Sequence, residues 1–344
     1  MTMKSFWMKW RAELLRGSVI FVVVVGLGLA LVSAFHSGVA RLKSTTGNGL
    51  AALAQGFGAS FGGDFDAPGR NHGDPWSWHS TLTPGQTLAI RDLSGPIEVT
   101  AAPGNETVVT AEKSWLNSDP NSVTVQAVPT SAGTMICAVW PGSTEGECSS
   151  GHNFNVHMNG RQHNDVAVKF VVQLARGVKI DVGGISGDVQ IEGATAGVTA
   201  NTVSGDLSIQ TSSWPVDLNT VSGDISVTTG SPGGDAAKVH SVSGDVHFNM
   251  PPNPDVTVRA TTVSGDVGDD FDLPVQEAKY TNSQSLNGTI GKGGAQLELV
   301  TVSGDINLGK ATTATVLIGK RAKGVTVVNG TPAPAAAPTP PAKP

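Results

Sequence analysis

The stretch Val203-Ser-Gly-Asp-Leu-Ser-Ile209 returns 18 residues later as Val221-Ser-Gly-Asp-Ile-Ser-Val227. Six copies of this Ile/Val-Ser-Gly-Asp motif occur between residues 185 and 305, and their glycines are Gly187, Gly205, Gly223, Gly244, Gly265 and Gly304. The first five glycines follow at intervals of 18, 18, 21 and 21 residues. A period of this length is typical of a repeat protein in which every repeat is one supersecondary unit. The sequence therefore predicts stacked coils.

Each repeat has an alternating apolar pattern on both sides of its glycine. Counted from the glycine, offsets −7, −5, −2, +2 and +4 are apolar with few exceptions, as in Val216, Leu218, Val221, Ile225 and Val227. A spacing of two indicates strands with one buried face. The parity changes between −5 and −2, which predicts a bulge or corner there. Offset −3 would then point outward, and it holds Thr202, Thr220, Ser241, Thr262 and Thr301.

The Ser-Gly-Asp triplet predicts a second corner, because glycine adopts positive φ readily and Ser and Asp side chains bond the nearby backbone. A further copy surrounds Gly95, with Pro96 in place of Asp, and a degenerate copy surrounds Gly288, so repeats measure 18–23 residues. We expect an all-β fold, a β-solenoid or closely related layered β-sheet array. It would comprise an N-terminal β region over 81–180 with a disulfide loop, and the Ser-Gly-Asp array over 181–329.

The regions outside the β-domain differ in composition. Residues 17–35 are nearly continuously apolar and uncharged, about 28 Å of helix, and Lys4, Lys9, Arg11 and Arg16 precede them. This predicts a cytoplasmic basic segment (1–16) and a transmembrane signal-anchor helix (17–35), with the remainder exported. Cleavage after Val32-Ser33-Ala34 is the alternative. Residues 36–80 are typical of a Gly-rich flexible stalk, and 330–344 of a Pro/Ala-rich disordered tail.

The net charge argues against one class of function, and the two cysteines predict a disulfide. The net charge is −6 and no basic cluster lies outside the N-terminal flank, which argues against nucleic-acid binding. Cys137 and Cys148 are separated by ten residues that include Pro141, Gly142 and Gly146. In an oxidising compartment this spacing predicts a disulfide that closes a hairpin loop, and two buried free thiols are the alternative.

Three features together resemble a known family. They are the opening strand pair over 88–100, a bridging strand over 168–182, and the run of Val-Ser-Gly-Asp copies. They are similar to the DUF4097 family of adhesin-like bacterial proteins with β-strand repeats, over roughly residues 81–329. The resemblance implies a β-repeat fold in a bacterial envelope, in some relatives beside stress-response genes. It implies no catalytic motif, because the family shares none.

The repeat aspartates are candidate calcium ligands, since they would form a column about 5 Å apart: Asp188, Asp206, Asp224, Asp245, Asp266 and Asp305. Calcium takes six to eight oxygens, and each coil offers one Gly-Asp without a second ligand at a fixed offset. We therefore favour turn capping over metal binding. His152, His157 and His163 form a further candidate zinc or copper group in a polar loop, although their spacing favours a solvated loop.

We expect no cofactor and no catalysis, because the sequence contains no phosphate-loop or His-Glu-x-x-His motif. The expected protein spans the bacterial inner membrane once, with a cytoplasmic N-terminus and a periplasmic β-domain. It would present a β-surface to an unidentified envelope protein or polysaccharide. One alternative is an envelope-stress regulatory module that acts through its anchor. Another is a polysaccharide-active β-helix enzyme.

Overall fold

The computed structural model describes residues 65–141, 148, 164–277 and 282–311. These residues form two stacked β-sheets, with one short 3-10 helix, η1 (Pro120–Ser122). Sheet A contains, in spatial order, β1 (Asn71–His72), β5 (Thr107–Trp115), β8 (Ala167–Leu174), β4 (Ile97–Ala101), β10 (Val189–Ala194), β12 (Leu207–Thr211), β14 (Ile225–Thr229), β16 (Val246–Met250), β22 (Ile306–Lys310) and β18 (Val267–Asp269), with β2 (Trp76–Ser80) also paired to β5.

Sheet B contains, in spatial order, β19 (Val275–Glu277), β20 (Gln284–Ile290), β17 (Val256–Ser264), β21 (Ala295–Ser303), β15 (Ala236–Ser243), β13 (Val216–Ser222), β11 (Val198–Ser204), β9 (Lys179–Gly183), β3 (Thr87–Arg91), β7 (Gly133–Val139) and β6 (Thr124–Thr130). The all-β layered architecture is thus confirmed. The predicted segments 1–16, 17–35 and 330–344 lie outside the described residues. Within those residues, no helix is long and apolar enough to span a membrane.

Every coil places one strand in each sheet. The residues before the motif glycine form a strand of sheet B, and the residues after it form a strand of sheet A. In the Gly223 coil, the inward side chains of Val216 and Leu218 on β13 meet those of Ile225 and Val227 on β14, and all four are at most 1% exposed. Equivalent side chains of every coil form one continuous core between the sheets.

The Ser-Gly-Asp corner brings neighbouring backbones unusually close. The six motif glycines have φ between 143° and 150°. A Cβ atom built on each glycine would lie 2.0–2.2 Å from a carbonyl oxygen of the glycine one coil earlier in space. Only glycine fits such a contact. Gly95 has φ 136° and meets the Val168 carbonyl in the same way, so the copy with Pro96 is a genuine coil.

The strand parity at this corner differs from the prediction. Inward positions continue through −7, −5 and −3, because the sheet-B strand runs straight into the glycine corner without a bulge. Thr220 and Thr301 are therefore 1% and 0% exposed, whereas Val242 at offset −2 points outward and is 39% exposed. In the first two coils the prediction is confirmed, because Leu93 and Ile185 at offset −2 belong to the core. Threonine suits this buried corner because its hydroxyl can bond the backbone, as Thr262 Oγ1 does to the Gly304 carbonyl at 2.9 Å.

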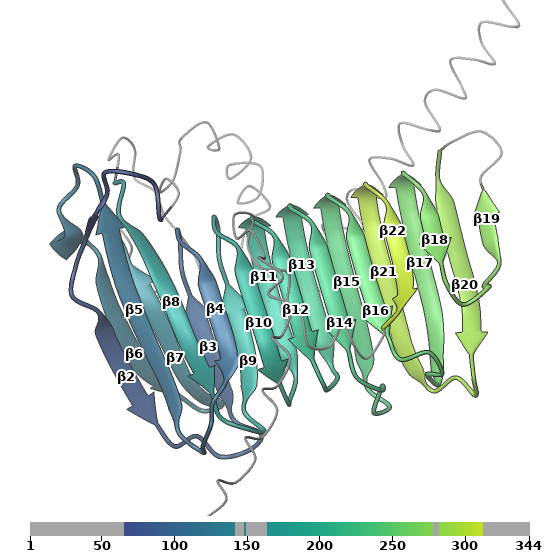
Figure 1. Ribbon diagram of the computed structural model, residues 1–344, viewed down its shortest axis with the longest axis horizontal. Helices are drawn as coiled ribbons and strands as arrows, with labels where there is room; N and C mark the ends of the chain where they lie inside the picture. The colour runs from purple at the N-terminus through teal and green to yellow at the C-terminus, as the bar shows by residue number, and fades with distance from the viewer. Residues whose placement is uncertain (1–64, 142–147, 149–163, 278–281, 312–344) are drawn as a thin grey trace, which may run out of the picture.

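The coils do not stack in sequence order. Strand β21 of the Gly304 coil pairs with β15 on one side and with β17 on the other, so the last copy lies between the Gly244 and Gly265 coils. In Figure 1 the yellow pair β21 and β22 accordingly sits within the green part of the array. The 21-residue interval before Gly265 equals the one before Gly244, so spacing carries no sign of this insertion.

Antiparallel strands close both ends of the array. The degenerate copy around Gly288 is not a coil, because β20 pairs antiparallel with β17 and then with the three-residue β19. Its offsets −7 and −5 are the polar Thr281 and Ser283, which do not supply the two inward apolar residues of a coil. At the other end β6, with Pro129, pairs antiparallel with β7. Short edges and an edge proline limit pairing with other chains.

Ordered structure begins earlier than residue 81. Strands β1 and β2 pair antiparallel with β5. Phe65 is 5% exposed, and buried Arg70 donates to the Ser114 hydroxyl and carbonyl, each at 2.8 Å. The predicted stalk boundary at residue 80 is therefore wrong for 65–80, where Trp76 and Trp78 also pack against the core. The segments 36–64 and 312–329 lie outside the described residues.

Replacing a corner glycine by alanine tests the close approach of the backbones of neighbouring coils. We expect Gly223→Ala to destabilise the protein by about 2 kcal/mol or more, since its Cβ would meet backbone 2.2 Å away at positive φ. Gly233→Ala is the control, because its Cβ would meet nothing within 4 Å. Thermal and urea unfolding of both variants measure the difference. Equal stability of the two variants would contradict the corner geometry.

Candidate functional site

The outer face of sheet A contains a shallow groove of about 620 Å³ that crosses the strands from β10 to β18. Its side chains come from two outward columns, at offsets +3 and +5 of successive coils. The polar residues that line it are Glu192, Ser208, Gln210, Ser226, Thr228, His247, Asn249, Asp269, Asp270 and Asn307. The volume is within the range of ligand-binding clefts.

Two glycines hollow the end of the groove near β18. A Cβ on Gly309 would lie 2.3 Å from Asn249 Oδ1, and a Cβ on Gly268 would lie 3.0 Å from Asn307 Oδ1. The two carboxamide groups therefore lean over the neighbouring glycines. Neither glycine has positive φ, so the backbone does not require glycine there. What the missing side chains provide is space.

Most polar side chains of the groove have no partner in the fold. Within the described part of the chain, no side-chain hydrogen bond is made by Ser208, Gln210, Ser226, Thr228, His247, Asn249 or Asn307. The carboxylates differ, because Asp269 Oδ1 accepts from the Phe271 and Leu273 amides at 2.7 and 3.1 Å, and Asp270 Oδ2 accepts from the Lys310 amide at 3.2 Å. Seven donor-acceptor groups thus face the groove without a protein partner and are available to a ligand.

The outer face of sheet B uses its polar groups internally. Asn219 Nδ2 donates to Asn201 Oδ1 at 2.9 Å and to Asp217 Oδ1 at 3.0 Å. Arg91 Nη2 pairs with Asp181 Oδ2 at 2.7 Å. On the same face burial lowers the pKa of His240, against nearby Glu298 and Asp217, with Lys238 acting in the same direction as burial. These side-chain bonds lie between β3 and β13. Towards β20 the same face has a second groove of about 630 Å³, whose lining includes Lys238, Arg259 and Glu298. The sheet A groove differs from it in having no Lys or Arg in its lining.

The comparisons with known proteins agree with the fold. A family model described as Toastrack DUF4097 matches residues 80–309, more than half of the 344-residue chain. The chain belongs to the Toastrack DUF4097 family. Its resemblance to that family, noted above from the motifs, is thereby confirmed. No curated protein matches the sequence.

Two solved structures are similar to this Toastrack chain. A proposed cell adhesion protein from Clostridium sporogenes has 12% identity and a TM-score of 0.39, over 69% of this chain and 100% of its own. A proposed adhesin from Bacteroides fragilis has 10% identity and a TM-score of 0.31, over 69% of this chain and 97% of its own. At these TM-scores the likeness carries no functional inference.

The six repeat aspartates of the Toastrack array form a ladder between coils. Oδ1 of the first five in stacking order accepts the backbone N–H of the aspartate in the next coil, as from Asp206 to Asp188 at 2.9 Å and from Asp245 to Asp224 at 2.8 Å. The expected capping role thus takes an inter-coil form, since each carboxylate satisfies an N–H of its neighbour rather than of its own turn. Among the described residues, no group of three or more His, Cys, Asp or Glu could hold a metal ion.

The ladder has defined ends. It begins at Asp188, because Pro96 in the preceding coil has no carboxylate to offer. After Asp266 the next partner is Gln284 of β20, whose Nε2 donates to Asp266 Oδ1 at 2.9 Å while its Oε1 accepts from the Val267 amide at 2.7 Å. One side-chain amide thus replaces both backbone groups that a further coil would supply.

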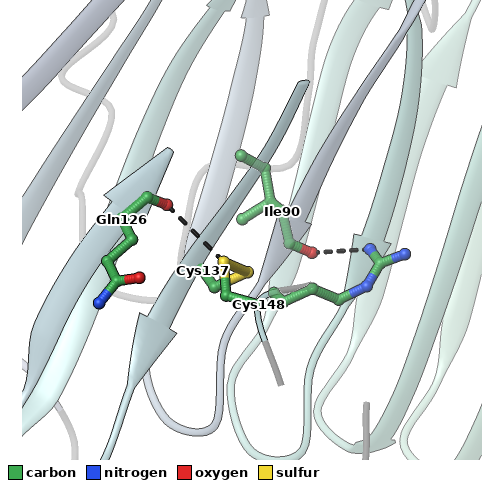
Figure 2. Close-up of a disulfide and its surroundings, with 5 residues drawn as sticks. Ile90, Gln126, Cys137 and Cys148 are labelled. Atoms are coloured by element: carbon green, nitrogen blue, oxygen red, sulfur yellow. Dashed lines mark hydrogen bonds between the residues drawn. A yellow bond between two sulfur atoms is a disulfide. The ribbon is translucent and has the colours of Figure 1, made fainter. Parts of the chain in front are cut away.

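Cys137 and Cys148 form the predicted disulfide, with Cα atoms 5.8 Å apart. Figure 2 shows it beside β7, where Cys148 Sγ lies 4.0 Å from the Gln126 carbonyl oxygen. Cys137 packs with Ala89 and Met135 in a small apolar cluster on the outer face of sheet B. His152, His157 and His163 lie outside the described residues.

Asp92 is a buried carboxyl group at offset −3 of the Gly95 coil, 1% exposed. Its Oδ1 lies 3.4 Å from the Ser94 amide, and its Oδ2 has no partner in the described structure. Burial raises the pKa of Asp92 well above its usual range, against the lowering effect of the Ser94 and Leu93 amides. The Gly187 coil has Gly184 at this column and the later coils have Thr or Ser, so the carboxyl group is specific to the first coil.

The sequence analysis did not identify the groove. The available signal was the absence of Lys and Arg at both outward columns of the array, which hold Ser, Thr, Asn, Gln, His, Gly and acidic residues. The hollow at Gly268 and Gly309 depends on coil order, which the sequence does not reveal.

Substitutions of Asp224 distinguish a backbone ladder from a calcium site. We expect Asp224→Ala to lower stability by about 1 kcal/mol, because the Asp245 amide loses its acceptor, and Asp224→Asn to stay near wild type. Thermal unfolding with calcium and with EGTA should coincide for all three proteins. A calcium-dependent rise in Tm that both substitutions abolish would contradict the ladder.

The raised pKa of Asp92 predicts a pH-dependent stability. The protonated Asp92 side chain favours the folded state over the ionised one. Its contribution to the free energy of unfolding is fully present below the unfolded pKa of about 3.9 and is lost as pH rises through the raised folded pKa. Asp92→Asn should therefore raise Tm at pH 7.5, and the gain should shrink at pH 4.5. Asp235→Asn, at an exposed turn, is the control and should show no such trend. A gain from Asp92→Asn that is independent of pH would exclude this explanation.

Proposed function

We propose that this protein is a non-catalytic recognition protein of the bacterial cell envelope, anchored in the inner membrane by residues 17–35. Its β-array would hold the groove of sheet A against another envelope component in the periplasm. The observation that carries the proposal is the row of polar side chains across β10–β18 that have no hydrogen-bond partner within the described protein. The disulfide between Cys137 and Cys148 supports export, since such bonds persist in oxidising compartments.

The rigidity of the array suits recognition. Parallel backbone ladders join every coil to its neighbours, and the Asp ladder joins the corners, so the groove has a fixed shape before any ligand arrives. Preorganised binding groups lower the entropy cost of association. Several weak polar contacts on adjacent strands then act together on one extended partner.

The groove is poorly suited to catalysis. Ser226, His247 and Asn307 are neighbours across β14, β16 and β22, yet their side chains make no hydrogen bond to one another in the described structure. Asp269 and Asp270 are adjacent, but both carboxylates accept hydrogen bonds from backbone amides. Glu192 stands at the opposite end, five strand spacings or roughly 24 Å from Asp270. Paired carboxylates of glycosidases lie within roughly 10 Å of each other. We therefore favour binding over the polysaccharide-active enzyme.

Co-sedimentation with envelope fragments of the bacterium that encodes the protein tests this function. The full-length protein should bind, and a version without residues 1–35 should still bind, because the groove and not the anchor makes the contact. Ser226→Arg with Thr228→Arg should abolish binding by blocking the groove. Thr257→Arg, on the exposed face of sheet B, is the matched control and should bind normally. Binding that requires residues 1–35 would instead support the regulatory alternative.

A further inference from the structure

We propose that the groove of sheet A binds an uncharged or amine-bearing polysaccharide that lies across the strands. This inference rests on the proposed function and names its ligand class. The first argument is the type of free group in the groove. Hydroxyl, carboxamide and imidazole side chains both donate and accept hydrogen bonds, as sugar hydroxyl and acetamido groups do. A polyhydroxylated polymer can satisfy such groups on every strand.

The spacing of these groups matches a repetitive ligand. Neighbouring strands lie about 4.8 Å apart, so a chain that crosses them meets a new pair of side chains at each step. The pair comes from offsets +3 and +5, as in Ser226 and Thr228 on β14 and His247 and Asn249 on β16. These two columns are about 6.7 Å apart along the strand, wide enough for one pyranose ring.

The charge of the lining limits the ligand further. The charged residues among the groove's lining are Glu192, Asp269 and Asp270, all acidic. An anionic polymer would meet like charges without a compensating Lys or Arg in the lining. Neutral sugars avoid this repulsion, and protonated amino sugars would be attracted to the acidic side chains. The lining itself therefore favours neutral or cationic glycans, with Lys310 the one cation at its hollow end among the described residues.

Hydrogen bonding rather than ring stacking would dominate recognition. Trp214 and Phe248 are 4% and 0% exposed and belong to the core. Phe271, next to Asp270 at the hollow end, carries the Lys310 ammonium 5.1 Å from its ring centroid. A site of this kind gains affinity from the number of strands engaged, so longer oligosaccharides should bind more tightly than short ones.

Titration calorimetry on the full-length protein in detergent tests the inference. The probes are chitohexaose, its deacetylated glucosamine counterpart, cellohexaose and an oligogalacturonate. We expect at least one of the first three to bind and the oligogalacturonate not to bind. His247→Ala with Asn249→Ala should weaken binding about tenfold or more, through the loss of two side-chain contacts. Their Tm should stay near wild type, since neither side chain bonds within the described fold.

Gly309→Ala provides a second, independent variant. Its Cβ would displace the Asn249 carboxamide without straining the backbone, so binding should fall while folding is kept. Gly104→Ala is the control, because its Cβ would meet nothing within 4 Å. Thr257→Ala with Arg259→Ala is the control for the outer face of sheet B and should leave binding unchanged.

The outcomes separate the two proposals. If no probe glycan binds but envelope fragments still bind through the groove, the polysaccharide inference is overturned and the partner is a protein. If neither binds, the proposed function fails as well. Preference for the oligogalacturonate, or glycan binding that survives all three groove substitutions, would also overturn the inference.

Discussion

The close backbone approach at the Ser-Gly-Asp corners is the constraint on which the array depends. Each motif glycine lets its coil sit against the glycine carbonyl of the coil before it, at a separation that a Cβ atom would prevent. At the same corner the aspartate N–H groups find carboxylate acceptors on the preceding coil. The glycine contact and the aspartate ladder together keep the coils in register. Equivalent residues of successive coils are therefore aligned, both in the core and on the outer faces.

A single register has different consequences on the two outer faces. On sheet B, between β3 and β13, aligned Asn, Asp and Arg side chains bond one another. On sheet A, aligned Ser, Thr, His and Asn side chains keep their hydrogen-bonding groups free, and two glycines deepen the surface. The stacking that stabilises the protein thus also builds an extended polar groove, without any loop dedicated to binding.

Much of this architecture follows from the sequence, because it depends on short-range pattern. Inward residues at −7, −5, +2 and +4, the glycine corners and the pairing of Cys137 with Cys148 were predictable from spacing and residue type. The orientation of −3 and −2 was predicted wrongly for the later coils, since a buried Thr beside a half-exposed Val inverts the usual polarity rule. Apolarity alone cannot show which of these two positions lies inside.

The remaining features depend on long-range pairing. Insertion of the Gly304 coil between two earlier coils, capping by Gln284 and antiparallel β20 involve partners 18 to 60 residues away that no local pattern marks. The shape of the groove depends on the same long-range pairing, so it could not be predicted from the sequence. Gly268 and Gly309 become neighbours of Asn307 and Asn249 only because β22 lies between β16 and β18.

Cysteine cross-linking of the corners tests the stacking most directly. Ser243 and Ser303 occupy paired positions on β15 and β21, whereas β21 separates Ser243 from Ser264. Neighbouring strands place Cα atoms about 4.8 Å apart, within disulfide range, and the separated pair lies about twice as far. Ser243→Cys with Ser303→Cys should form a bond under mild oxidation, identified by mass spectrometry, and Ser243→Cys with Ser264→Cys should not. The reverse result would mean that the coils stack in sequence order and would contradict this account.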